Sequence, residues 1–117
     1  MASAVPPRDR RLHLGWQFRE AYRSGRSFHG TLMSLVSMAR SDDYGRVAFV
    51  AGRKVGPAVR RNRAKRLLRE AWRSLPESIR EEPCWRIWVA RASCAGASLA
   101  EIRAEMGRLL EQRRAAP

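Results

Sequence analysis

Cationic side chains that could bind phosphate gather in one segment of this sequence, residues 53–73. The segment holds nine lysines and arginines and a single acid, Glu70, so it contributes +8 to a formal net charge of +13. Guanidinium and ammonium groups close together neutralise a polyanion, and arginine can bind two phosphate oxygens at once. The chemistry that this segment predicts is therefore electrostatic binding of a nucleic acid.

A helical repeat places these cations on one side of a predicted helix. Gly56-Pro57 predicts the helix start, because the first turn does not need the N–H that proline lacks. The Leu75-Pro76 pair predicts the end near residue 73 or 74, because the residue before a proline avoids helical angles. The apolar side comprises Ala64, Leu67, Leu68 and Ala71. The opposite arc of about 100° comprises Asn62, Lys65, Arg66, Arg69 and Arg73.

The charge at the start of this helix favours a bound ligand over a merely solvated surface. Arg60, Arg61 and Arg63 lie in the N-terminal half, where the helix dipole disfavours cations by about 0.3–1 kcal/mol each. A bound phosphate reverses that cost, because the free N–H groups and the arginines then bind the anion together.

No set of residues in this sequence is predicted to cleave RNA by itself. The acids are scattered, Asp42-Asp43 belongs to a turn, and His13 and His29 are isolated. Cys84 and Cys94 lack the spacing of metal ligands, and two unpaired thiols are typical of a reducing, cytoplasmic compartment. No apolar run approaches the ~20 residues that a membrane span needs, so we expect a soluble protein.

The N-terminal half predicts the elements that precede the basic helix. Residues 1–11 lack periodicity and predict a flexible basic arm, followed by a single RNA-binding α+β domain over residues 12–114. Residues 16–24 predict a short helix. Residues 27–39 are a long β-type run interrupted at Gly30, and residues 47–51 are a second. The turn residues between them predict that these two runs form a hairpin.

The C-terminal part supplies one more strand and one more helix. Residues 77–82 predict a brief helical turn, and residues 85–90 predict a central strand that is buried on both faces. A capping box of Ser98 with Glu101 opens a last helix. The expected fold class is α+β, a two-layer sandwich with the helices packed on a central mixed sheet of about four strands.

The motifs of the basic segment resemble those of a known family, the protein component of bacterial ribonuclease P. The resemblance extends over roughly residues 10–112. It rests on Lys54-Val55-Gly56, Ala58-Val59, Arg61-Asn62-Arg63, Lys65-Arg66 and Arg69-Glu70 at the family's spacing. Outside the helix it includes Arg11-Leu12, Phe18, Tyr22, Gly25 and Val89-Ala90-Arg91.

The resemblance implies a subunit that assembles with a large catalytic RNA and assists it in removing the 5′ leader of precursor tRNA. It implies the element order αβββαβα, with a left-handed crossover around the basic helix. Cleavage is expected from the RNA with its bound Mg²⁺, and the partners are the catalytic RNA and precursor tRNA, with no membrane and no small-molecule substrate.

Family roles transfer to the positions of this chain that match the motifs. The expected RNA-binding residues are Arg53, Lys54, Arg60, Arg61, Asn62, Arg63, Lys65, Arg66, Arg69 and Arg73. Phe18, Tyr22 and Val36 are the expected contacts to the single-stranded leader, and an aromatic pair beside cations could stack unpaired bases. Val36 stands where many members have an aromatic residue, and Gln17 replaces a common acid.

Three other classes could use the same basic helix. A ribosome-type structural protein would bind ribosomal RNA, and a DNA reader would insert the helix into the major groove. The second is disfavoured because no partner helix lies at helix-turn-helix spacing. A membrane-surface helix is the least favoured, because the apolar face is narrow and Trp72 is its only aromatic residue.

Overall fold

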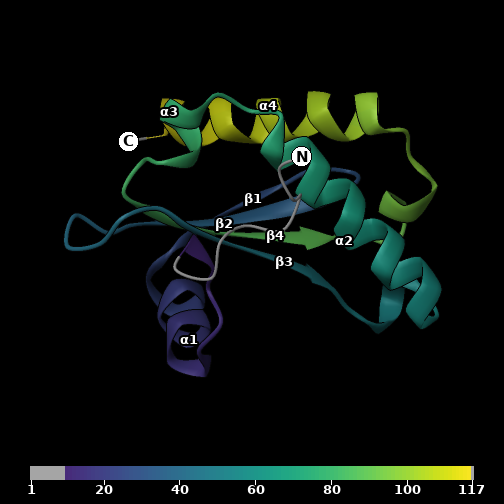
Figure 1. Cartoon of the computed structure of the whole chain (residues 1–117), viewed down its shortest axis with the longest axis horizontal. Coiled ribbons are helices and arrows are strands. Elements are labelled where there is room, and N and C mark those ends of the chain that lie inside the picture. The colour runs from purple at the N-terminus through teal and green to yellow at the C-terminus, as the bar shows by residue number, and fades with distance from the viewer. Residues whose placement is uncertain (1–9, 117) are drawn as a thin grey trace.

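A four-stranded mixed sheet forms the centre of the molecule (Figure 1). The computed structural model describes residues 10–116. The strands are β1 (Arg26–His29), β2 (Met33–Ala39), β3 (Arg46–Ala51) and β4 (Cys84–Ala90), in the spatial order β1-β2-β4-β3. β2 pairs antiparallel with both β1 and β4, whereas β3 and β4 are parallel. The predicted α+β class and mixed sheet are confirmed.

The helices cover both faces of this sheet. They are α1 (Gly15–Ser24), α2 (Ala58–Arg73), α3 (Glu77–Arg80) and α4 (Leu99–Ala115), with short 3₁₀ turns η2 (Arg53–Val55) and η3 (Cys94–Gly96). Figure 1 shows α2 and α4 on one face and α1 alone on the other. The sheet with α2 and α4 forms the expected two-layer sandwich, and α1 covers the second face of the sheet.

Each face of the sheet has its own hydrophobic core. On one face Leu35 and Trp88 pack with Leu68 of α2 and Met106 of α4, and all four are buried. On the other face, Val36 and Ile87 pack with Ala21 of α1 and Leu12. Consecutive residues of β2 and β4 therefore enter different cores, which explains why both strands are apolar at nearly every position.

The predicted hairpin between the runs 27–39 and 47–51 is wrong. β4 lies between β2 and β3, so that Trp88 is paired with Leu35 on one side and with Phe49 on the other. A turn such as residues 41–45 has the same local chemistry whether its flanking strands pair or not. A strand buried on both faces gains most at the centre of the sheet, and β4 takes that position.

The other element predictions are largely confirmed. The run 27–39 is interrupted after His29, and β1 and β2 form an antiparallel pair around Gly30. The helix of the basic segment ends at Arg73, and Ser98 with Glu101 forms the capping box of α4. Most of the predicted arm, residues 1–9, lies outside the described residues, whereas Arg11 forms a parallel bridge with Val47 of β3. Over residues 10–116, no helix has both the length and the apolar character needed to cross a membrane.

Candidate nucleic-acid interface

The cations of α2 lie on the side of the helix that faces away from the core. Ala64, Leu68, Ala71 and Trp72 are buried against the sheet and α4. Arg60, Asn62, Arg63, Arg66 and Arg73 are exposed, and Arg61, Lys65 and Arg69 are half-buried. The predicted division of the helix into two faces is confirmed, with Trp72 as an additional core residue and Leu67 at the boundary.

The turn η2 adds two cations beside the start of α2. Val55 is buried and anchors this turn, so Arg53 and Lys54 remain exposed. Gly56 then adopts a φ of 129°, a conformation that side-chain-bearing residues rarely take, and the chain turns into the helix there. The motif Lys54-Val55-Gly56 therefore forms the turn that brings two cations next to the helix start.

These cations have few partners within the protein. Across the described residues, no ion pair involves an arginine or lysine of α2 or η2. Arg63 Nε donates to the carbonyl oxygen of Ala95 at 2.8 Å, and Arg60 Nε donates to that of Val55 at 3.2 Å. Arg61 Nε is buried and finds no acceptor among the described residues. A buried donor without an acceptor is unusual.

A hollow of about 190 Å³ joins α1 to α2 across the edge of the sheet. Its lining residues are Arg11, Leu12, Phe18, Val47, Ala48, Phe49 and Arg69. The structure therefore brings Phe18, a predicted leader contact, to the same hollow as Arg69, a predicted RNA contact. Arg11 Nε is also buried without an acceptor in this part of the chain.

The other two predicted leader contacts differ in accessibility. Tyr22 lies one turn after Phe18 on α1 and is 52% exposed, and burial raises the pKa of its hydroxyl. Val36 is only 6% exposed and belongs to the core that Phe18 partly covers. Its side chain therefore supports the layer below Phe18 and is not presented to solvent.

Arg91 joins the cationic surface, although the sequence indicated it only as part of the Val89-Ala90-Arg91 motif and not as an RNA contact. β3 and β4 are parallel, so the residues that follow them meet at one edge of the sheet. Arg53 and Lys54 follow β3, Arg91 follows β4, and all three line a hollow of about 630 Å³. In the sequence, a basic residue follows each of the two β-type runs within two positions. This pattern predicts a shared cationic site only if the two strands are adjacent and parallel.

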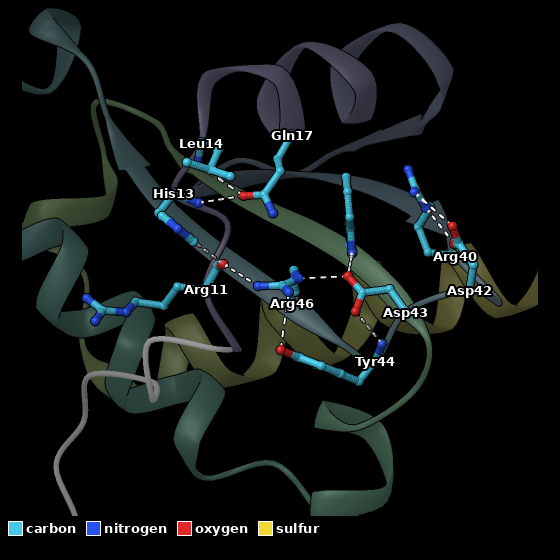
Figure 2. Close-up of polar contacts among 10 residues, drawn as sticks. Arg11, His13, Leu14, Gln17, Arg40, Asp42, Asp43, Tyr44 and Arg46 are labelled. Atoms are coloured by element: carbon cyan, nitrogen blue, oxygen red, sulfur yellow. Dashed lines mark hydrogen bonds and ion pairs between the residues drawn. The ribbon is translucent and has the colours of Figure 1, made fainter.

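Polar contacts fix the start of α1, the helix that carries Phe18 (Figure 2 shows the contacts). The side-chain oxygen of Gln17 accepts hydrogen bonds from the backbone N–H groups of His13 at 2.9 Å and Leu14 at 3.0 Å. Gln17 is 3% exposed, so its neutral amide satisfies buried donors without burying a charge. This explains how glutamine can replace the family's common acid at this position.

The turn residue Asp43 anchors the same region from the opposite side (Figure 2). Its carboxylate accepts from Arg46 Nε at 2.7 Å and from Trp85 Nε1 at 2.9 Å. Burial by itself would raise the pKa of Asp43, but the hydrogen bonds from Arg46, Trp85 and Tyr44 N hold it below its ordinary value. Asp42 instead pairs with Arg40 and is exposed, so both acids lie in the turn but only Asp42 is a solvated residue.

Comparison with known proteins identifies the family. A family profile described as Ribonuclease P matches residues 7–114. The ribonuclease P protein component of Alkaliphilus oremlandii is 33% identical over 102 residues, covering 87% of this chain and 89% of that protein. That of Clostridioides difficile is 33% identical over 97 residues, covering 81% and 83%.

Solved structures share the fold. The RNase P protein of Staphylococcus aureus aligns with a TM-score of 0.77 at 20% identity, covering 89% of this chain and 94% of that chain. The RNase P protein of Thermotoga maritima aligns with a TM-score of 0.74 at 24% identity, covering 87% and 96%. The profile match includes the sheet, the basic helix α2 and the turn η2, and on that match the chain belongs to the family of ribonuclease P protein components.

Proposed function

We propose that this protein is the subunit of a ribonucleoprotein endoribonuclease that removes the 5′ leader from precursor tRNA. Its α2 face and η2 turn bind the catalytic RNA, and Phe18 and Tyr22 bind the single-stranded leader. The observation on which the proposal depends is the outward face of α2, where cations lie together without acidic partners among the described residues. RNA phosphates would supply the missing counter-charge.

The contact to the leader is supported by the hollow between α1 and α2. An unpaired base stacks on an aromatic ring while its phosphate pairs with a nearby cation. Phe18 and Arg69 offer these two groups within one hollow, and Tyr22 extends the aromatic surface along α1. The hollow has a volume of about 190 Å³, and the proposal assigns it to a single strand because only unpaired bases can stack on the ring of Phe18.

The proposal assigns Mg²⁺ and the cleavage step to the RNA. Within residues 10–116, no group of three His, Cys, Asp or Glu side chains lies close enough together to hold a metal ion. The protein's own contribution is electrostatic: its cations reduce the repulsion between the two RNAs and position phosphates that bind Mg²⁺.

Reconstitution with a candidate catalytic RNA and a precursor tRNA tests this function. We expect no cleavage by the protein alone, and we expect the protein to lower the Mg²⁺ concentration that the RNA needs for turnover. The product ends should mark the junction between leader and mature tRNA. Equal turnover at low Mg²⁺ with and without the protein would contradict the proposal, as would recovery of ribosomal RNA as the predominant RNA bound in cells.

A further inference from the structure

A second cationic hollow lies at the corner of the sheet where β1 fails to cover β2. β1 begins at Arg26, opposite Ser37, so Met38 and Ala39 of β2 extend beyond it. The ends of α1 and α4 both border this corner. The two helices lie on opposite faces of the sheet (Figure 1). The resulting corner hollow has a volume of about 730 Å³, which is within the range of nucleotide-sized ligand sites.

Arginines from several elements converge on the corner hollow. Arg26 of β1, Arg40 after β2, and Arg113 and Arg114 of α4 line it, together with only two acids, Glu20 and Glu82. Arginine in the last turn of a helix is favoured by the helix dipole, which accounts for Arg113 and Arg114. Arg40 reaches the hollow from the sheet, where it pairs with Asp42 and lies over the ring of Trp85.

The two acids at the corner hollow are already paired with arginines outside it. Glu20 accepts from Arg23 at 2.7 Å, and Glu82 accepts from the buried Arg86 at 2.6 Å. Arg113 donates to the thiol sulfur of Cys84 at 2.9 Å, and Arg114 approaches Glu111 only at 3.8 Å. Arg40 is itself paired with Asp42 at 2.8 Å, so the positive charge that lacks a close acidic partner among the described residues is that of Arg113 and Arg114.

Trp16 does not line the corner hollow, but Trp85 connects it to Arg40, which does, and this aromatic group indicates what kind of anion fits. Trp16 lies one helical turn before Glu20 on α1 and is 48% exposed. Its ring meets Trp85 edge-on at 5.6 Å between centroids, and Arg40 lies over Trp85 at 4.2 Å. A half-exposed indole next to arginines is a surface for stacking an unpaired base whose phosphates reach the cations.

We propose that the corner hollow is a second RNA-binding site, which takes an unpaired stretch of RNA through Arg113 and Arg114, with Trp16 stacking on a base. This inference rests on the proposed function, because it assumes an RNA partner. The C-terminal end of α4, which lines the hollow, and the N-terminal half of α2 lie toward opposite ends of the long axis (Figure 1), which extends over 36 Å. Two separate RNA segments would therefore be held at the two ends of the protein.

The test compares the double variant Arg113→Gln/Arg114→Gln with a matched control, Arg108→Gln. Arg108 lies on the same helix and is equally basic, but it does not line the hollow. The affinity of the full-length protein for the catalytic RNA is measured against salt, and the affinity of the assembled complex for precursor tRNA is measured separately. We expect the double variant to weaken one of these affinities and to flatten its salt slope by about 0.7–0.9 log units per lost phosphate contact. A lower affinity for the catalytic RNA would mean that the hollow binds that RNA, and a lower affinity for precursor tRNA would mean that it binds the substrate.

Three further variants exclude indirect effects. Arg113→Lys should retain most of the affinity, because the positive charge remains. Glu20→Gln should raise the affinity, since it removes a negative charge from the same hollow. Trp16→Leu should weaken binding without changing the salt slope, because stacking involves no ion release. Melting temperatures of all variants verify that the fold is intact.

The two proposals fail in different ways. If Arg66→Ala weakens RNA binding while the double variant behaves like Arg108→Gln in both arms, the corner hollow is not an RNA site and the function of α2 stands. If neither change alters RNA binding, the proposed function itself is overturned. Loss of binding to poly-glutamate without any loss of RNA binding would assign the hollow to an acidic protein and would also overturn the inference.

Discussion

At the scale of single residues, exposure and ion pairs within the protein determine which cationic side chains are available to a phosphate. Arg86 is as basic as Arg66, but it is 1% exposed and pairs with Glu82. Arg66 is exposed, and no ion pair of the described chain includes it. Residue type alone does not separate these two arginines, whereas their position on an element does.

Replacement of Arg66 by alanine is expected to weaken binding to the catalytic RNA. Each phosphate contact that is lost should also flatten the dependence of log affinity on log salt by about 0.7–0.9. Binding isotherms at several salt concentrations measure both effects, with Arg108→Ala, an exposed arginine of α4, as the control. An unchanged slope would show that Arg66 is only solvated.

Replacement of Tyr22 by alanine is expected to impair substrates that have a leader. A stacked base contributes about 1–3 kcal/mol, so the assembled complex should lose that much affinity for precursor tRNA and none for mature tRNA. Tyr22→Phe retains the ring and should behave as the wild type. Equal losses for precursor and mature tRNA would contradict a specific contact to the leader.

At the scale of elements, one buried carboxylate connects α4 to the β1–β2 turn. Glu105 is 2% exposed and accepts hydrogen bonds from the backbone N–H groups of Thr31, Leu32 and Met33 at 2.6–3.0 Å, and from the Thr31 hydroxyl at 2.9 Å. A Cβ at Gly30 would lie 2.5 Å from the Glu105 carboxyl carbon, so the turn requires glycine there. Ser93 also donates to the Thr31 carbonyl at 2.7 Å, and both residues line the hollow of Arg53 and Arg91.

Glu105→Gln is expected to destabilise the protein in a pH-dependent way. Burial by itself would raise the pKa of Glu105, but the hydrogen bonds from Leu32, Thr31 and Met33 hold it below the ordinary value of 4.5. The ionised carboxylate therefore stabilises the fold above about pH 4.5, and this stabilisation is lost as the pH falls through the lower pKa of the folded state.

Denaturant unfolding at several pH values measures this difference. Near neutral pH the variant should lose about 1–3 kcal/mol, since its amide cannot accept all the donors that the carboxylate satisfies. The gap to the wild type should narrow below pH 4.5. Glu111→Gln, on the same helix with a side chain that is 74% exposed, is the matched control. A loss that does not change with pH would indicate a packing defect.

At the scale of the whole molecule, the packing of the sheet and its helices makes both cysteines inaccessible. Cys94 is fully buried in the core of α2 and α4, and Cys84 is 3% exposed. Burial and the negative charge of Glu105 raise the pKa of Cys94 to about 11. A buried, protonated thiol is a poor nucleophile.

Thiol labelling is therefore expected to report global unfolding. An aromatic disulfide reagent at pH 7–8 should react with neither cysteine of the native protein on the time scale in which it labels both in denaturant. The labelling rate should rise in parallel with the loss of circular dichroism on heating. Rapid labelling of one thiol in the native protein would mean that one core opens locally.

The sequence by itself determined the composition of α2 and most element boundaries, because these depend on helical repeats, prolines and caps within a few residues of one another. It also identified the family, since Arg61-Asn62-Arg63 and its neighbours form a contiguous motif. Phe18 and Tyr22 were likewise readable as an aromatic pair one turn apart.

Only the tertiary structure decided which distant residues meet. It placed β4 between β2 and β3, joined Phe18 to Arg69 in one hollow, and brought Arg91 beside Arg53. It also connected Glu105 to a turn more than 70 residues earlier and gathered four arginines at the corner hollow. These contacts depend on strand order and on which face of the sheet each helix covers. The strand order and the placement of the helices follow from burying two cores at the same time, and no local pattern in the sequence predicts that arrangement.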